Sequence, residues 1–201
     1  MACNPAKHHR RSIRLKGYDY SKAGLYFITI NTQNRACLFG TIENGEMILN
    51  EAGMMVENEW LKLLERFQNI ALHEYVVMPN HFHAILEIVG ATLVVAQPLV
   101  VTQPHMVAQN ENGQPQGIAP TGKTVGDMVG AFESITTVEY IRGVKTNNWQ
   151  IFDKKLWQRN YHEHIIRNEQ SYIKISEYII NNPANWDNDS LNKFKYQNGK
   201  K

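Results

Sequence analysis

Two histidines, His81 and His83, stand one residue apart at the start of the apolar segment 81–89, HFHAILEIV. This composition predicts a strand, in which residues i and i+2 point to the same face of a sheet. Both imidazoles would then leave the sheet together, with Phe82 on the opposite face. Two such imidazoles can share a divalent metal ion, but a third ligand must come from another element. Two histidines capping a hairpin give the same pattern, and the chain repeats it at 162–164.

A second candidate pair lies near the end of the chain. The apolar residues of 168–181 recur at helical spacing, and Pro183 ends the predicted helix. Tyr178 and Asn182 are one helical turn apart, so their side chains face the same point. A phenol there is a possible nucleophile. The ordinary alternative is a core tyrosine followed by an asparagine that terminates the helix.

The elements that would carry these residues follow from the same patterns. Short β-branched and aromatic segments predict strands at 25–33, 37–42, 46–49, 71–78, 81–89 and, shorter, 162–166. Helical periodicity predicts helices at 51–67 (with Asn50 as the N-cap), 124–142 and 168–181. Antiparallel strands combined with helices predict an α+β fold. We expect an antiparallel sheet with helices packed mainly on one face, close to the ferredoxin-like arrangement.

The domain organisation is predicted from shifts in composition. Residues 1–24 form a basic N-terminal arm, and 25–183 form one domain. A Gln/Pro-rich stretch at 90–122 interrupts that domain, and we interpret it as a surface insertion because structureless segments of this length are uncommon inside compact domains. Residues 184–201 are polar and are expected to be a frayed tail.

The bulk composition sets wider limits. The 201 residues are 43% hydrophobic and 20% charged, with a net charge of +2 and a pI near 8.5. This charge does not by itself indicate a nucleic-acid-binding protein. The run 7–16 is basic without an acidic residue, which favours phosphate contact as much as a solvated terminus. Two isolated cysteines, no signal sequence and no long apolar run predict a soluble cytoplasmic protein with no membrane contact.

Four strings in fixed order resemble one known family. They are RRSIRLKGYDYSKAGLYFITINTQNR at 10–35, VVMPNHFHAIL at 76–86, LWQRNYHEHIIRNE at 156–169 and EYIINNP at 177–183. Together they closely resemble the REP-associated tyrosine transposases, which are single-tyrosine HUH transposases of the insertion-sequence-200-like superfamily. The resemblance covers nearly all of the chain except the insertion and the tail.

The resemblance implies a mechanism and a set of site residues. His81 and His83 match the family's metal-binding pair, Tyr178 its nucleophile, and Asn182 the polar residue that completes the metal site. The cofactor implied is Mg²⁺ or Mn²⁺, and the reaction is cleavage and joining of single-stranded DNA, in DNA transposition and recombination, through a 5′-phosphotyrosine. The implied partner is single-stranded DNA with hairpin structure, bound by a monomer or a homodimer, with the tyrosine acting in cis or in trans.

Candidate DNA contacts are cationic and aromatic side chains. The cationic candidates are Arg10, Arg11, Arg14, Lys16, Arg35, Arg159 and Arg167. The aromatic candidates for stacking on unpaired bases are Tyr18, Tyr20, Trp157 and Tyr161, and of these Trp157 is also a candidate for the hydrophobic core. One departure from the family stands in VGAFES, where Gly130 and Glu133 replace residues that are often basic, so a phosphate contact there is in doubt.

Two other functions fit parts of the sequence. A domesticated relative would be a non-catalytic nucleic-acid-binding module, although all four site positions are filled here. A metal phosphoesterase that uses water as its nucleophile would need the histidines but not Tyr178, and would form no covalent DNA adduct.

Overall fold

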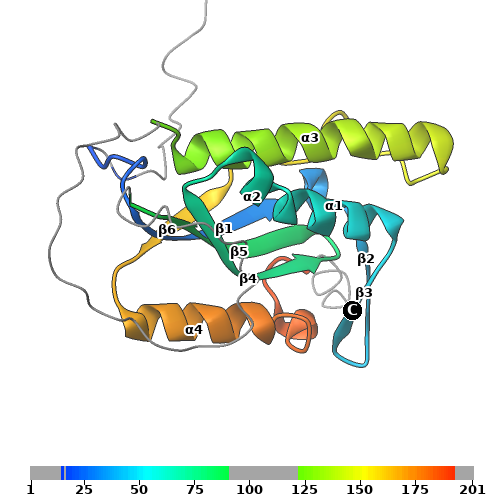
Figure 1. Cartoon of the computed structure of the whole chain (residues 1–201). Coiled ribbons are helices and arrows are strands. Elements are labelled where there is room, and N and C mark those ends of the chain that lie inside the picture. Colours follow the sequence, from blue (N-terminus) through cyan, green and yellow to red (C-terminus); the bar gives the residue numbers. More distant parts are fainter. Residues whose placement is uncertain (1–14, 16, 91–121, 193–201) are drawn as a thin grey trace, which may run out of the picture.

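The computed structural model describes Leu15, residues 17–90 and residues 122–192 (Figure 1). The strands are β1 (Gly24–Asn31), β2 (Gly40–Glu43), β3 (Glu46–Leu49), β4 (Ile70–Met78), β5 (His81–Ile88) and β6 (His162–Ile166). The α-helices are α1 (Glu51–Leu61), α2 (Leu63–Arg66), α3 (Val125–Thr146) and α4 (Glu169–Ile180). Two short 3-10 turns are η2 (Gln33–Arg35) and η4 (Trp186–Asn188). No helix among these residues is long and apolar enough to cross a membrane.

The main sheet has the strand order β4-β5-β1-β6, and each neighbouring pair is antiparallel. β4 and β5 form the predicted hairpin around Pro79 and Asn80, with Met78 paired to His81. β5 lies between β4 and β1, so the two histidines begin a strand that has neighbours on both sides. β2 and β3 form a separate hairpin. The predicted α+β class with an antiparallel sheet is confirmed.

Helices cover both faces of this sheet, as Figure 1 shows, with α1 and α3 on one face and α4 on the other. Strand alternation divides the side chains accordingly. The large core on the α1 and α3 side contains Phe82 and Leu86 of β5, whereas Ile85 belongs to a small cluster with Ile179 of α4. Most of the helices, α1, α2 and α3, therefore lie on one face, as predicted. α4 alone covers the face that carries His81.

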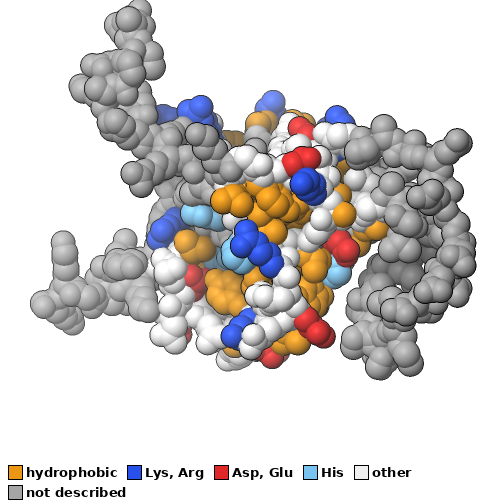
Figure 2. Space-filling model, turned by 90° about the vertical axis from the view of Figure 1, so that its left-hand side faces the viewer, with side chains coloured by type: hydrophobic (Ala, Val, Ile, Leu, Met, Phe, Trp, Pro, Cys, Tyr) orange, Lys and Arg blue, Asp and Glu red, His pale blue; other side chains and the backbone are white. Residues whose placement is uncertain are grey.

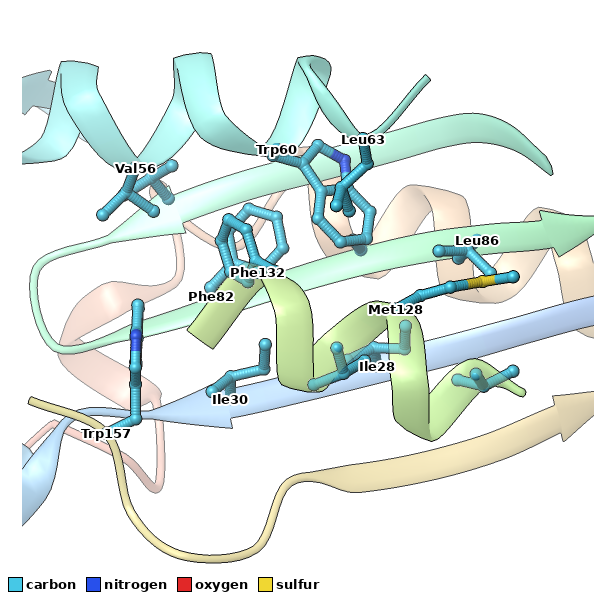
Figure 3. Packing of buried hydrophobic residues seen from close by; sticks show 14 of the residues in the cluster. Ile28, Ile30, Val56, Trp60, Leu63, Phe82, Leu86, Met128, Phe132 and Trp157 are labelled. Atoms are coloured by element: carbon cyan, nitrogen blue, oxygen red, sulfur yellow. The ribbon is translucent and has the colours of Figure 1, made fainter. Parts of the chain in front are cut away.

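Aromatic rings dominate the large core (Figure 3). The ring of Trp60 in α1 lies 4.9 Å from Phe82 and 5.4 Å from Phe132 of α3, centroid to centroid. Trp157, between α3 and β6, is 4% exposed and donates its indole hydrogen to Thr136 Oγ1 over 2.8 Å. Edge-to-face ring pairs and a satisfied indole make this a well-specified core. Its rigidity holds β5 in place from the side opposite the site.

Local signals set most helix ends. Asn50 and Asn168 accept hydrogen bonds from Gly53 N and Ser171 N, so both act as N-caps of α1 and α4. The helix predicted at 51–67 is broken at Lys62 into α1 and α2. α3 continues to Thr146, beyond the predicted end at 142.

The prediction of a frayed tail from Ala184 is wrong for residues 184–192. The chain continues past α4 into η4, and the side chain of Trp186 is buried. Arg35 donates a hydrogen bond to Ser190 O, and Asn80 donates one to Leu191 O, which hold the segment against the end of the sheet. A buried indole and two long-range hydrogen bonds outweighed the polar composition on which the prediction rested. The stretch 193–201 and most of the 90–122 insertion lie outside the described residues.

Candidate active site

His81 and His83 project from β5 toward α4 and are almost completely buried, with 0% and 2% of their surfaces exposed. Their ring centroids are 4.5 Å apart. The Nδ1 atom of His81 lies 2.8 Å from Asn80 Oδ1, and that of His83 lies 2.8 Å from Thr29 Oγ1 on β1. With both Nδ1 atoms engaged, the Nε2 atoms are the ones left to bind a ligand, which is the usual arrangement of metal-binding histidines.

Both imidazoles are held in the neutral form. Burial lowers the pKa of His81 to about 3, and the charge of Arg35 acts in the same direction. Burial also holds the pKa of His83 well below its ordinary value, and His81 next to it lowers that pKa further. A neutral imidazole has the lone pair that a metal ion needs, so the site offers two nitrogen ligands at physiological pH.

Tyr178 reaches this pair from α4. Its hydroxyl lies 3.3 Å from His83 Nε2, and its ring meets the ring of Phe27 edge to face at 6.1 Å. The residue is nevertheless 47% exposed, so a large substrate can reach the hydroxyl. Partial burial and the negative charge of Asp189 raise the pKa of the Tyr178 phenol above its ordinary value. The phenol is therefore protonated at neutral pH and needs an activating group to act as a nucleophile.

Three buried polar atoms around the histidines have no hydrogen-bond partner among the described residues. They are His81 Nε2, Asn182 Oδ1 and Asp189 Oδ2. Buried acceptors without donors are costly and rare in folded proteins, so each of these atoms needs a partner that the described residues do not supply. All three are lone-pair donors of the kinds that bind divalent cations. This arrangement fits a metal ion held by His81, His83 and Asn182, the ligand set expected from the sequence.

In the described residues, no three His, Cys, Asp or Glu side chains are already arranged around a metal ion, so His81, His83 and any carboxylate near them would have to draw closer together to bind one. The proposed ligand set is mixed, because it combines two imidazoles with the carboxamide of Asn182. This residue lies one helical turn after Tyr178. That carboxamide lies beside both His81 and the Tyr178 hydroxyl, and its contact with the hydroxyl offsets only part of the rise in the pKa of the phenol. The four predicted site residues therefore meet at one point between β5 and α4.

The structure describes only three of the predicted cationic DNA contacts, Arg35, Arg159 and Arg167. Arg10, Arg11, Arg14 and Lys16 lie outside the described residues. Arg35 lies beside the site and holds Ser190 O, whereas Arg159 and Arg167 are exposed. On the face shown in Figure 2, Lys and Arg side chains stand in separate groups with hydrophobic and histidine side chains between them.

Arg159 has cationic neighbours that the sequence did not single out. It lines a surface hollow together with Gln33, Asn34, Lys154, Lys155, Gln158, Asn160 and His162. Several hydrogen-bond donors and three formal positive charges line this hollow. Such a lining suits the negatively charged backbone of a nucleic-acid strand. These lysines follow α3 in a loop, where no periodicity marks them.

The aromatic candidates for base stacking are mostly engaged within the fold. Trp157 is a core residue, so its predicted role in stacking on DNA is wrong: both faces of the ring pack inside the protein. Tyr18 and Tyr20 pack against each other at 4.9 Å and against the core, and Tyr161 is also partly buried against it.

Sequence reasoning missed four residues around the site. Thr29 and Asn80 orient the histidines, Trp186 stacks against His81 at 6.0 Å, and Asp189 points its carboxylate at the same imidazole. Thr29 could have been found from the pairing of β1 with β5, which sets it directly opposite His83. The other three offered no periodic signal.

Comparison with known proteins identifies the fold. The chain is 42% identical over 188 residues to an uncharacterized protein of Haemophilus influenzae, covering 94% of this chain and 96% of that protein. It is similar to the structure of a REP-associated tyrosine transposase bound to a REP hairpin, with a TM-score of 0.50, 19% identity and coverage of 89% of this chain and 73% of that one. No protein-family model matches the chain. The chain therefore belongs to one family with the Haemophilus influenzae protein, and its fold is that of the REP-associated tyrosine transposases.

Proposed function

We propose that this protein is a metal-dependent transposase that cleaves and rejoins single-stranded DNA through Tyr178. The observation that carries the proposal is the position of the Tyr178 hydroxyl, 3.3 Å from His83 Nε2 and beside three buried lone-pair donors. A tyrosine that served only in packing would have no reason to lie half exposed over an unsatisfied polar cluster. The fold shared with a REP-associated tyrosine transposase supports the same assignment.

The reaction is a transfer of a phosphodiester to the tyrosine. The Tyr178 oxygen bonds to the scissile phosphorus, and the bond from phosphorus to the 3′ oxygen breaks. The phenol proton passes to solvent, and the leaving 3′ oxygen is protonated as a free 3′-OH. The product is a 5′-phosphotyrosine, from which a second 3′-OH displaces the tyrosine and joins the strands. No nucleotide is consumed, because the covalent ester conserves the energy of the broken bond.

The residues around the phenol prepare this step. The Nε2 atoms of His81 and His83 and the Asn182 oxygen would hold Mg²⁺ or Mn²⁺. That ion, when bound, supplies positive charge that polarises the phosphate and favours the phenolate. Phe27 restrains the tyrosine ring by its edge-to-face contact, and Thr29 orients His83. The chain thus holds the nucleophile in place and leaves its outer side open to DNA.

The substrate that we propose is single-stranded DNA with hairpin structure. The solved relative is described as bound to a REP hairpin. The hollow around Arg159, Lys154 and Lys155 offers cations for phosphates of such a strand. The basic arm before β1 would add further phosphate contacts.

A covalent adduct tests the proposal. Hairpin oligonucleotides from the flanks of the gene, labelled at the 5′ or 3′ end, are incubated with the protein and Mn²⁺ and resolved on a denaturing gel. We expect an adduct on the 5′ phosphate that disappears in Tyr178→Phe and in the presence of a chelator. Tyr75→Phe is the matched control, because Tyr75 packs against the core on the α1 side of the sheet and its hydroxyl donates to Glu57, away from the site.

Two results would reject the proposal. Cleavage that persists in Tyr178→Phe, without adduct, would indicate a phosphoesterase that uses water. Binding of the hairpin without cleavage on any flank, with duplex controls showing that the DNA is folded, would indicate a non-catalytic binding module.

A further inference from the structure

The turn that follows α4 brings a carboxylate into the site. Asp189 has a side chain that is only 5% exposed, and its Oδ2 lies 3.6 Å from His81 Nε2. Its other oxygen, Oδ1, accepts a hydrogen bond from Leu191 N over 2.7 Å. This bond and the packing of Trp186 against His81 fix the direction in which Oδ2 points.

The hydrogen bonds of Asn80 decide which nitrogen of His81 carries the proton. The Asn80 amide nitrogen donates to two carbonyl oxygens, those of Arg35 and Leu191, at 3.3 and 2.9 Å. Its Oδ1 must therefore be the atom that faces His81 Nδ1, 2.8 Å away, and Nδ1 must donate to it. In the neutral ring, Nε2 then has a lone pair and no hydrogen. That lone pair faces the lone pairs of the Asp189 carboxylate.

Two buried lone-pair donors that face each other repel unless a cation lies between them. A buried carboxylate without a partner is among the most costly groups in a protein interior. In the octahedral geometry at about 2.0–2.1 Å that Mg²⁺ prefers, two ligand atoms are separated by about 2.9 Å at right angles and by about 4.2 Å when opposite. The distance of 3.6 Å between His81 Nε2 and Asp189 Oδ2 lies between these two values, so a shift of about 0.7 Å would bring the carboxylate to the right-angle position.

We propose that Asp189 is a ligand of the metal ion that His81, His83 and Asn182 hold, supplied by the turn after the tyrosine helix. This inference rests on the proposed function, whose metal site it completes. Two imidazoles and a carboxamide bring no negative charge, whereas Mg²⁺ and Mn²⁺ prefer carboxylate oxygens. Asp189 provides the missing charge, so the ion stabilises the fold of 184–192 as well as the site.

Titration of the full-length protein with Mn²⁺ in a calorimeter, without DNA, tests the proposal. We expect Asp189→Asn to weaken Mn²⁺ binding about tenfold or more, because the amide retains the Oδ1 acceptor and the shape but loses the charge. Asp187→Asn is the matched control: it makes the same charge change at an exposed position of the same turn, and its affinity should stay within about twofold of wild type. Unchanged affinity in Asp189→Asn, with binding abolished in His81→Ala, would overturn the proposal.

Thermal unfolding separates a ligand from a merely structural residue. Without metal, we expect Asp189→Asn to be at least as stable as wild type, because an unpaired buried charge has been removed, and to lose the rise in Tm that Mn²⁺ gives wild type. A metal-free Asp189→Asn that melts earlier than wild type but keeps the Mn²⁺-dependent rise would overturn the proposal. Failure of the proposed function would give a different result from failure of this inference. In that case, wild-type protein would bind Mn²⁺ normally but form no Tyr178 adduct with DNA.

Discussion

At the residue scale, the chemistry that we propose for the site depends on side chains that touch the histidines as well as on the histidines themselves. Thr29 fixes His83 through Nδ1, and Asn80 fixes His81 in the same way. Such contacts set the tautomer and the ring orientation, and hence the direction of the free Nε2. The core behind β5 prevents the strand from adjusting if one of these contacts is lost.

Thr29→Val tests the contact to His83. Valine has nearly the same shape, so the strand should fold normally while the Nδ1 partner is lost. We expect Mn²⁺ affinity and the rate of adduct formation to fall about 10- to 100-fold. The exposed Thr41 on β2 gives a control, Thr41→Val, that should change neither quantity. Wild-type affinity in Thr29→Val would show that His83 needs no orienting partner.

Glu133 should make stability depend on pH. Burial raises the pKa of its carboxyl from an ordinary 4.5 to about 7, and its Oε1 lacks a hydrogen-bond partner among the described residues. The folded state binds the proton more tightly than the unfolded state, so the free energy of unfolding falls as pH rises from about 4.5 to 7 and is level above that. We expect Glu133→Gln to be about 1–2 kcal/mol more stable than wild type at pH 8, after allowance for partial exposure, and nearly equal to it at about pH 5.

Urea denaturation at these two pH values measures the effect. The exposed Glu65 on α2 serves for comparison, because Glu65→Gln should not change stability in a pH-dependent way. Equal pH profiles for wild type and Glu133→Gln would contradict the burial argument. Because Glu133 is not one of the proposed site residues, Glu133→Gln should form the DNA adduct at the wild-type rate.

At the element scale, α3 contains two glycines with opposite structural roles. Gly143 is buried against Trp149, whose indole is anchored by a hydrogen bond to Glu51, and a Cβ at Gly143 would overlap the indole ring. Gly130 is exposed, and a Cβ there would meet nothing within 4 Å. The close approach at Gly143 lets the end of α3 pack onto the loop that leads toward β6.

The two alanine substitutions should therefore differ in sign. Gly130→Ala removes backbone entropy from the unfolded chain and should stabilise the protein by about 0.5–1 kcal/mol. Gly143→Ala must displace an anchored indole and should destabilise it by about 1–3 kcal/mol. Chemical denaturation of both variants measures this, and stabilisation by Gly143→Ala would show that Trp149 moves aside freely.

At the scale of the whole molecule, the four proposed site residues meet within one chain. Tyr178 lies against the histidines of its own chain, although 95 residues separate it from His83. The helix that carries it is anchored to β4 by hydrogen bonds from Tyr172 and Ser176 to Glu74. These bonds hold α4 on its own sheet and favour catalysis in cis.

Mixing inactive variants tests this arrangement. We expect a mixture of Tyr178→Phe and His83→Ala to form no DNA adduct, because neither chain holds both the nucleophile and the metal ligands. If subunits exchanged their tyrosine helices, the mixture would regain up to about a quarter of wild-type adduct formation, since a swapped dimer can assemble one intact site. Recovery of adduct in the mixture would establish a site shared between chains.

Local sequence patterns were sufficient to predict much of the structure of this protein. Alternation along β5 predicted that His81 and His83 share a face, and helical spacing predicted that Tyr178 and Asn182 do. The α+β class and the N-cap at Asn50 followed from signals within a few residues of each position. The roles of these residues in chemistry came from the family resemblance and stay predictions until the adduct is measured.

Other features depended on contacts between distant segments, which leave no periodic trace in the sequence. The sequence left Trp157 as a candidate both for DNA stacking and for the core, and packing between α3 and β1 buries it. Asp189 looked like part of a polar tail, yet the turn at Trp186 carries its carboxylate to His81, more than a hundred positions earlier in the chain. The sequence by itself determined which side chains share a strand or helix face. The tertiary structure alone decided which of those faces meet, because burial and hydrogen bonding across the fold depend on residues that are neighbours only in space.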